Sequence, residues 1–330
     1  MSKNILIIID DIELKYFEFN DLITNFWFIK EFLKRNYNVS IALKRDLYIE
    51  NAKAYVLNRK SYLKDENIFY NKEQQKHLIN DFDVVFFRPD PPVDTNYIDA
   101  CYIFDYVDRE KTLLINDPSE VKNFNEKFHI NYFPEFVPKN IVTNSAELII
   151  DFVEKEKEAI LKPLNRCFGS GVYYLNKEDK NLLTIINTMT EDGRTPVMVQ
   201  EYLPQAKYGD KRVLIIGETV LEECIQKLPG DHNFKFSTHS DRFFKDAKLS
   251  QNEKNIAQEI AKKLSKRGLF LIGLDVINEK VIEINVTSPC YFIREINQHY
   301  GIHFEEKIMD CLEEIIEKHF SKERVYAVNK

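Results

Sequence analysis

Short apolar runs alternate with a helical pattern in the first part of the chain. Ile5 to Ile9 has the length and unbroken apolar character of a buried parallel strand. A helical stripe follows over residues 22–34, and residues 39–43 resume as a strand. Further buried-type strands lie within residues 83–87 and 112–115. This β-α-β alternation predicts a doubly wound, mostly parallel sheet that ends near residue 120.

The pattern continues with mixed strands and helices. Residues 141–143, 159–163 and 196–204 are predicted strands, and a helix capped by Ser145 lies between the first two. A capping box at Ser250 opens a helix with a buried apolar stripe, and residues 303–319 form a C-terminal helix. The irregular composition of residues 228–248 predicts a long mobile loop.

Residues 273–289 predict a β-hairpin, since two runs rich in Leu, Ile and Val flank turn-forming residues at 278–280. With a three-residue loop, Asp275 lies opposite Glu283, and Asn285 shares the face of Glu283. The residues alternating with them should face a core: Val276, Ile282, Ile284 and Val286. Hard oxygen ligands on a rigid support suit Mg²⁺. The alternative is an edge hairpin whose polar residues lie in water.

Three cationic positions suggest anion contacts. Lys162 sits in an apolar run where an unpaired ammonium is costly, so either a phosphate or a carboxylate should accompany it. Arg212 follows Lys211 at the start of an apolar strand, which indicates an anion site or a solvated edge. Arg88 lies in a stiff proline-rich connection, as an anion contact or an ion-pair strut. Glycines in the loop 165–171 could approach phosphates through backbone N–H groups.

Composition narrows the class of protein. A chain of 330 residues predicts two or three domains, and the net charge of -7 disfavours nonspecific nucleic-acid binding. The five cysteines lack zinc-type or redox-type spacing, so we expect free thiols in a reducing compartment. No signal peptide or membrane-length apolar run is present in the sequence, which predicts a cytoplasmic protein without a membrane partner. The first strand lacks a Gly-x-Gly-x-x-Gly fingerprint, which disfavours an NAD enzyme.

Taken together, six stretches resemble the bacterial-type glutathione synthetases of the ATP-grasp superfamily. They cover roughly residues 80–295 and read Arg-Pro-Asp-Pro-Pro-Val-Asp-Thr (88–95), Asn-Glu-Lys (125–127), Ile-Leu-Lys-Pro-Leu (160–164), Val-Met-Val-Gln-Glu-Tyr-Leu-Pro (197–204), Gly-Asp-Lys-Arg (209–212), and Gly-Leu-Asp with Glu-Ile-Asn-Val-Thr-Ser-Pro (273–289). The resemblance implies an α/β (α+β) ATP-grasp fold. Its expected domains are an N-terminal doubly wound domain (1–122), a central lid domain (123–200) and a C-terminal domain carrying the metal site (201–330).

The resemblance also assigns roles to residues. ATP would be held by phosphate-binding, loop, adenine-lining and ribose-binding residues: Lys127, Lys162, Gly169, Gly171, Glu201, Tyr202, Leu203 and Asp210. Mg²⁺, or Mn²⁺ in its place, would be held by Asp275, Glu283 and Asn285. Arg212 would contact the acyl substrate and its phosphate as the catalytic residue, and the substrate site would add Arg88, Lys227 and Ser288.

The implied chemistry is carboxylate activation. A small-molecule acid attacks the γ-phosphoryl group of ATP, and an amine converts the acyl phosphate to an amide. Glutathione formation from γ-glutamylcysteine and glycine is the leading reaction. A peptide or amino-acid ligase with another acyl substrate, or a non-catalytic ATP-binding regulator, is the alternative. The family also suggests a homo-oligomer, and lids at 165–171 and 228–248 that exclude water.

Departures from the family pattern fall near the acyl substrate and the lids. Arg166 and Phe168 replace flexible positions in the first lid, which should stiffen it. The second lid is shorter and aromatic at residues 231–236, and Lys227 stands at the place of an arginine. The loop from Glu13 to Phe19 is aromatic and acidic, which would suit a different acyl donor.

Overall fold

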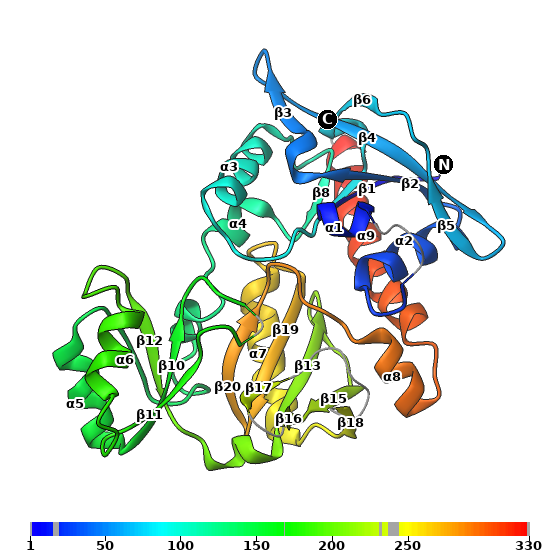
Figure 1. The fold of residues 1–330 in the computed structure, drawn as a ribbon. Helices are drawn as coiled ribbons and strands as arrows, with labels where there is room; N and C mark the ends of the chain where they lie inside the picture. Colours follow the sequence, from blue (N-terminus) through cyan, green and yellow to red (C-terminus); the bar gives the residue numbers. More distant parts are fainter. Residues whose placement is uncertain (1, 16–19, 168, 231–232, 237–243, 329–330) are drawn as a thin grey trace.

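The computed structural model describes residues 2–15, 20–167, 169–230, 233–236 and 244–328. In Figure 1 an N-terminal part (blue to cyan) lies above a central part (green) and a C-terminal part (yellow to orange). The last helix, α9 (Phe304–Val328), returns to the N-terminal part, where it packs on α2 (Thr24–Lys34). The predicted helix over 303–319 is therefore confirmed, and it continues to Val328.

The predicted parallel sheet is present in the N-terminal part. Strand β1 (Asn4–Ile9) pairs in parallel with β2 (Asn38–Leu43) and with β7 (Val84–Phe87), and β7 pairs with β8 (Leu113–Ile115). Every residue of β1 after Asn4 is buried, as expected for a strand covered on both faces. The carboxyl ends of β1 and β7 lie side by side, which places the following loops at one edge of the sheet.

An antiparallel extension of this sheet was not predicted. Strands β3 (Leu47–Glu50), β5 (Asn67–Tyr70) and β6 (Gln75–Leu78) all pair with β4 (Lys53–Lys64), which joins the parallel strands through β2. Short helices cover and connect the part: α1 (Asp11–Lys15), α3 (Thr95–Ile103) and α4 (Pro118–Lys122). Helix α8 (Ile293–Tyr300) instead packs on α9 and on strands of the C-terminal part. Single 3₁₀ turns lie at Lys44–Asp46, Ile79–Asp81, Phe104–Tyr106, Phe128–Tyr132 and Pro204–Tyr208.

The central part is an antiparallel sheet with its own small core. Its strand order is β11 (Tyr173–Asn176), β10 (Glu158–Pro163), β12 (Val197–Glu201) and β9 (Asn140–Thr143). Helices α5 (Ala146–Glu156) and α6 (Leu182–Met189) pack against it. The predicted cap of α5 is confirmed, because the Ser145 hydroxyl accepts a hydrogen bond from the Leu148 N–H (3.3 Å).

The C-terminal part is a second antiparallel sheet covered by a long helix. Its order is β18 (Phe244–Ala247), β15 (Cys224–Lys227), β13 (Asp210–Ile216), β19 (Leu271–Ile277) and β20 (Lys280–Asn285), with β14 (Thr219–Val220) beside β13. Helix α7 (Gln251–Ser265) begins with the predicted capping box at Ser250. The prediction of one irregular loop over 228–248 was wrong, because β16 (Pro229–Gly230), β17 (Asn233–Phe236) and β18 lie within it.

The predicted hairpin forms, with a shorter turn than expected and with a bulge. Its turn has two residues, Asn278 and Glu279, with φ of 49° and 62°, as in hairpin turns that require positive φ. A bulge between Asp275 and Val276 then restores the predicted pairing of Asp275 with Glu283. Ile282 is the extra residue and lines a cavity, so its predicted place in the core was wrong.

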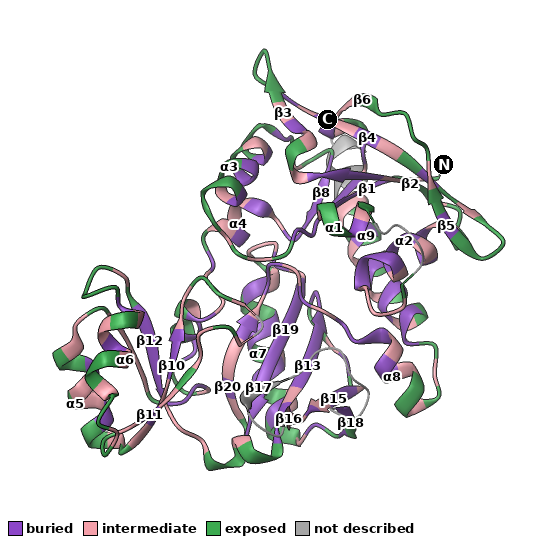
Figure 2. Ribbon diagram, viewed as in Figure 1, coloured by how far each residue is buried: buried purple, intermediate pink, exposed green. Residues whose placement is uncertain are grey.

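Burial follows the sheets, as Figure 2 shows in purple for β13 and β19, whereas the central helices carry exposed positions. The segment after α4 packs on β20, since the Val281 N–H donates to the Phe136 carbonyl (2.8 Å) and the Ile284 N–H to that of Glu126 (3.1 Å). These hydrogen bonds connect the residues that lead into the central part to the hairpin. Within the described residues, no helix combines the length and the apolar character needed to cross a membrane.

Candidate active site

A cavity of about 830 Å³ is lined by residues from all three parts of the chain. It collects these predicted site residues: Arg88, Lys127, Lys162, Gly169, Glu201, Tyr202, Leu203, Asp210, Arg212, Lys227, Asp275, Glu283, Asn285 and Ser288. Gly171 is the predicted residue outside that lining. Its φ of 74° and the close approach of the Arg166 and Pro163 side chains require glycine there, which shapes the loop behind the cavity.

Asp275 lies at the centre of a charged network on the hairpin. Arg212 grips it with two hydrogen bonds, from Nε to Oδ1 (2.8 Å) and from Nη2 to Oδ2 (3.1 Å). Lys227 Nζ donates to Oδ1 (2.9 Å), and Asn285 Nδ2 donates to Oδ2 (3.2 Å). Burial opposes ionisation, but the two neighbouring cations hold the pKa of Asp275 well below its ordinary value. The carboxylate is therefore kept ionised inside the protein.

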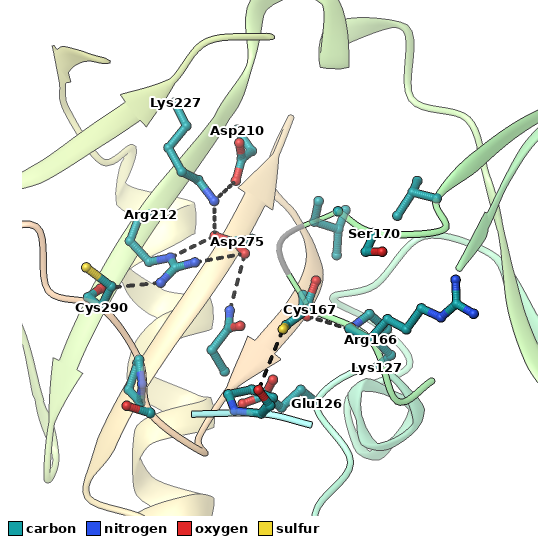
Figure 3. A pocket seen from close by; sticks show the side chains of 18 of the residues that line it. Glu126, Lys127, Arg166, Cys167, Ser170, Asp210, Arg212, Lys227, Asp275 and Cys290 are labelled. Atoms are coloured by element: carbon teal, nitrogen blue, oxygen red, sulfur yellow. Dashed lines mark hydrogen bonds and ion pairs between the residues drawn. The ribbon is translucent and has the colours of Figure 1, made fainter. Parts of the chain in front are cut away.

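Lys227 bridges two carboxylates. Figure 3 shows its ammonium between Asp275 and Asp210, whose Oδ2 lies 2.7 Å away. Burial raises the pKa of Asp210 to about 7, although Lys227 counteracts this shift. An ammonium can satisfy two carboxylates from one point, whereas the planar fork of arginine suits one carboxylate in a bidentate contact. The lysine at this position therefore couples the predicted ribose-binding residue to the predicted metal site.

The second hairpin carboxylate has its own cation. Lys127 Nζ lies 2.9 Å from Glu283 Oε1 and also donates to the Arg166 carbonyl (2.8 Å). Burial opposes ionisation of Glu283, yet Lys127 and Lys162 lower its pKa below the ordinary value. The contact to Arg166 fastens the loop 165–167 over this pair, which positions that loop near the phosphate-binding residues expected from the sequence.

Lys162 lacks such a partner. Its Nζ donates to the Ile282 carbonyl (3.3 Å), and among the described residues no carboxylate lies within ion-pair distance. Burial lowers its pKa to about 8. The sequence left a phosphate or a carboxylate open as its partner; the described residues place no carboxylate at ion-pair distance, and the phosphate contact stays a prediction.

The donor set of the hairpin fits a divalent cation. Asp275, Glu283 and Asn285 present carboxylate and amide oxygens from two paired strands to one cavity. No group of three or more His, Cys, Asp or Glu side chains within the described ranges could hold a metal. This agrees with a set of two carboxylates and one amide, completed by water and phosphate oxygens.

The predicted adenine-lining residues lie at the end of β12. The Glu201 carboxylate accepts a hydrogen bond from the Lys139 N–H (3.1 Å), which orients it at the strand end. The Tyr202 ring meets Tyr174 edge to face, with centroids 5.3 Å apart. This end of the cavity joins the central sheet to the 3₁₀ turn that begins at Pro204.

Arg88 forms no ion pair among the described residues, and its predicted contact with an anion stays a prediction. Its Nε donates to Asn25 Oδ1 (2.9 Å) and its Nη2 to the Pro289 carbonyl (3.0 Å). Nη1 is buried without a hydrogen-bond partner among the described residues. Ser288, one residue before Pro289, contacts Asp90 through its side chain.

Sequence reasoning missed three residues around the cavity. Glu126 Oε1 accepts hydrogen bonds from the Val286 and Thr287 N–H groups (both 2.9 Å) and so anchors the end of the hairpin. Glu13 and Asn25 form a buried contact described below. Their signal is weak: Asn25 is a single polar residue on the buried face of a predicted helix, and the sequence around Glu13 indicates only an acidic, aromatic loop.

Three predictions concern residues outside the described ranges. They are the restraint of the first lid by Phe168, the part of the second lid (231–236) that lies at residues 231–232, and the aromatic part of the first loop at residues 16–19. These stay predictions.

Comparison with known proteins identifies relatives over nearly the whole chain. The family description "Prokaryotic glutathione synthetase, N-terminal domain" matches residues 4–122, and "Prokaryotic glutathione synthetase, ATP-grasp domain" matches residues 126–301. A glutathione synthetase of Buchnera aphidicola subsp. Baizongia pistaciae is 33% identical over 298 residues, covering 89% of this chain and 92% of the relative. One of Vibrio parahaemolyticus serotype O3:K6 is 34% identical over 292 residues, with 88% and 92% covered.

Solved structures show the same fold at lower identity. The D-cycloserine synthetase DcsG superposes with a TM-score of 0.67 at 13% identity, covering 95% of this chain and 99% of that one. D-alanyl-alanine synthetase A from Vibrio cholerae O1 biovar eltor gives 0.58 at 12% identity, covering 96% and 99%. The predicted ATP-grasp fold is thereby confirmed.

Proposed function

The chain belongs to the prokaryotic glutathione synthetase family, and from this premise we propose that it joins γ-glutamylcysteine to glycine in an ATP-dependent reaction. The observation that carries the proposal is the shared cavity, in which cations for phosphates and oxygen donors for a metal meet an anion contact from the N-terminal part. The family match favours glutathione synthesis over a ligase for another acid and over a non-catalytic regulator.

ATP would lie along the cavity between the central and C-terminal sheets. Its adenine would lie against Glu201, Tyr202 and Leu203, and its ribose at Asp210. Lys127 and Lys162 would receive phosphates, covered by the loop of Gly169 and Gly171. The burial of Lys162, which has no carboxylate at ion-pair distance among the described residues, supports this placement.

A divalent cation would be held by Asp275, Glu283 and Asn285. We propose Mg²⁺, with Mn²⁺ as a substitute, because both accept carboxylate and amide oxygens. When bound, such an ion neutralises charge on the phosphates during transfer. Arg212 and Lys227, which hold Asp275 in this structure, would keep the carboxylate oriented while it binds the ion.

The reaction would proceed in two displacements. The cysteinyl carboxylate of γ-glutamylcysteine attacks the γ-phosphorus of ATP, and ADP leaves, which gives an acyl phosphate. The amine of glycine then attacks the acyl carbon, inorganic phosphate leaves, and the amine loses a proton. Arg212 would stabilise charge on the acyl phosphate, which is the catalytic role we assign to it. Enclosure by the loop that carries Gly169 and Gly171 would protect the intermediate from water.

We extend the proposal to three further properties. The domains are taken as 1–122, 123–200 and 201–330, which the junction of the two family matches between residues 122 and 126 supports for the first boundary. The family resemblance supports a homo-oligomer. Scattered cysteines without a pairing pattern support a cytoplasmic location. Sedimentation tests the oligomeric state.

Phosphate release and mass spectrometry test the proposed reaction. The purified chain, incubated with ATP, Mg²⁺, γ-glutamylcysteine and glycine, should release phosphate and form glutathione in equal amounts. Release only with other acids would assign the scaffold to a different ligase. Tight ATP binding without turnover across a panel of acids would indicate a regulator instead.

A further inference from the structure

A hydrogen-bonded chain of three side chains lines the end of the cavity formed by the N-terminal part. Asn25 Nδ2 donates to both carboxylate oxygens of Glu13 (2.9 and 3.1 Å), and Asn25 Oδ1 accepts from Arg88 Nε (2.9 Å). All three side chains line the cavity and are at least nine-tenths buried. One amide therefore orients an anion and a cation at the same wall.

Glu13 is buried without a cation of its own. Its carboxylate accepts from the Asp10 N–H (3.0 Å) and from Asn25, and within the described ranges no Lys or Arg lies at ion-pair distance. Asp90, across the wall, adds negative charge rather than compensating it. Burial accordingly raises the pKa of Glu13 to about 7. A ligand ammonium would supply the missing charge.

Among the described residues, Arg88 lacks an acceptor for one of its nitrogens, whereas Glu13 lacks a cation. Two of its nitrogens are occupied, and Nη1 is buried without a hydrogen-bond partner in the part of the chain that the structure describes. A buried guanidinium nitrogen without an acceptor is costly, and a carboxylate would satisfy it. Asn25 contacts Arg88 through Nε and Glu13 through its carboxylate, so it links the two side chains.

The position of this chain along the cavity indicates which part of a substrate would reach it. Arg88 Nη2 donates to the Pro289 carbonyl (3.0 Å) and Arg212 Nη1 to the Cys290 carbonyl (3.3 Å), so the two arginines reach adjacent residues of one segment of the cavity wall. The reacting carboxylate of the acid must lie near Arg212 and the phosphates. An acid held there by its reacting carboxylate can extend across this segment toward Arg88 and Glu13, which line the same cavity from the N-terminal part.

The geometry points to Glu13 as a specificity-determining residue that receives the ammonium of the acid substrate's remote amino-acid group, while Arg88 receives its carboxylate. This inference rests on the proposed function, because γ-glutamylcysteine carries such a zwitterionic group at the end that does not react. Asn25 is a positioning residue, because its amide contacts both charged side chains.

Three ligands test the assignment by calorimetry with Mg²⁺ and a non-hydrolysable ATP analogue present. They are γ-glutamylcysteine, glutarylcysteine, which lacks the α-ammonium, and 4-aminobutanoylcysteine, which lacks the α-carboxylate. Glu13→Gln should raise the Kd of the two ligands that carry the ammonium about 10- to 100-fold, since a charged hydrogen bond is lost. The Kd of glutarylcysteine should not change. Arg88→Lys should raise the Kd of the two ligands that carry the remote α-carboxylate and leave the Kd of 4-aminobutanoylcysteine unchanged.

Asp11→Asn is the matched control, because it removes a carboxylate from the same short helix at an exposed position paired with Arg45. It should change none of the three affinities. Glu13→Asp is a second variant that retains the charge one methylene short. Its loss should be intermediate and confined to ammonium-bearing ligands.

If Glu13→Gln raised the Kd of all three ligands equally, Glu13 would act only as a structural support and the assignment would be overturned. Unchanged affinities, or wild-type protein that binds the three ligands equally, would also overturn it. Failure of the proposed function has a separate readout: wild-type protein would form no glutathione, while the ammonium-dependent difference in binding persists.

Discussion

The hairpin β19–β20 and the wall around Glu13 bury the same kind of side chain with opposite results. Asp275 and Glu283 lie beside Arg212, Lys227 and Lys127, and their pKa values are lowered despite burial. Glu13 has no such neighbour among the described residues, and its pKa is raised to about 7. Burial alone therefore does not set the pKa of these three carboxylates, because the cations beside Asp275 and Glu283 outweigh it. At Asp210, by contrast, burial outweighs the contact with Lys227.

This difference separates two kinds of binding site. The hairpin keeps its carboxylates ionised, which is the state that would coordinate the proposed metal ion. The wall around Glu13 holds a carboxylate that gains its counter-charge from a ligand. Asp10 and Asp90 follow the same pattern as Glu13, because burial raises the pKa of each.

The largest effect should come from removing charge on the hairpin. Glu283→Gln should lower kcat/KM for ATP by about 10²- to 10³-fold, because a ligand of the phosphate-neutralising ion is lost. Steady-state phosphate release over a Mg²⁺ titration measures this. Glu279→Gln, an exposed residue in the turn of the same hairpin, is the control and should retain normal turnover. A Glu283→Gln enzyme with wild-type Mg²⁺ dependence would remove Glu283 from the metal site.

Removing the cation without a carboxylate partner should separate binding from stability. Lys162→Met should raise the Kd for ATP about 10- to 100-fold, since a charged contact to phosphate is lost. The same change should raise the Tm of the ATP-free protein, because a buried ammonium is replaced by an apolar chain of similar length. Calorimetry and thermal melting measure the two quantities. Wild-type ATP affinity in the variant would contradict the assignment.

The two carboxylate environments should also differ in how stability depends on pH. The folded protein holds the Glu13 proton between its ordinary pKa of 4.5 and about 7, so its contribution to stability is lost as pH rises through that window. The free energy of unfolding of Glu13→Gln, taken relative to that of wild type, should therefore rise by up to about 2–3 kcal/mol between pH 4.5 and pH 8.

Glu283→Gln should show the opposite slope. The pKa of Glu283 lies below 4.5 in the folded protein, so its contribution is present above that pH and is lost on acidification. Denaturant unfolding at several pH values measures the free energy of unfolding of each variant relative to wild type. The titration of groups that all three proteins share cancels in these differences. Parallel slopes for the two variants would show that neighbouring charge does not distinguish these sites.

The smallest effect should come from the support of the hairpin turn. The Ser250 hydroxyl caps α7 and donates to Glu279 Oε1 (2.5 Å), which ties the turn to the helix. Ser250→Ala should cost about 1 kcal/mol of stability and leave kcat unchanged. Thermal melting and turnover measure this, with Gln251→Ala, an exposed residue at the start of the same helix, as the control that should alter neither quantity appreciably. A large loss of kcat in Ser250→Ala would mean that the turn controls the metal site.

Local sequence pattern predicted the parts of the fold whose signals lie within one element. The parallel strands, the caps of α5 and α7 and the facing of Asp275 and Glu283 could be read from apolar runs, capping residues and strand period. The turn length was wrong because two successive residues with positive φ are not encoded by Asn278 and Glu279 alone. The antiparallel strands at 47–78 were missed, since their pairing partners lie in other segments.

The sequence by itself determined the family motifs, the two strands that carry the proposed metal donors and the cations proposed to bind phosphates, because each lies within a short contiguous stretch. Only the tertiary structure decided which charges meet. Lys227 reaches Asp275 from another strand, and Asn25 joins Glu13 to Arg88 across three separate elements. Electrostatic interactions depend on distance in space, so the protonation of these groups follows from the folded arrangement rather than from their order in the chain.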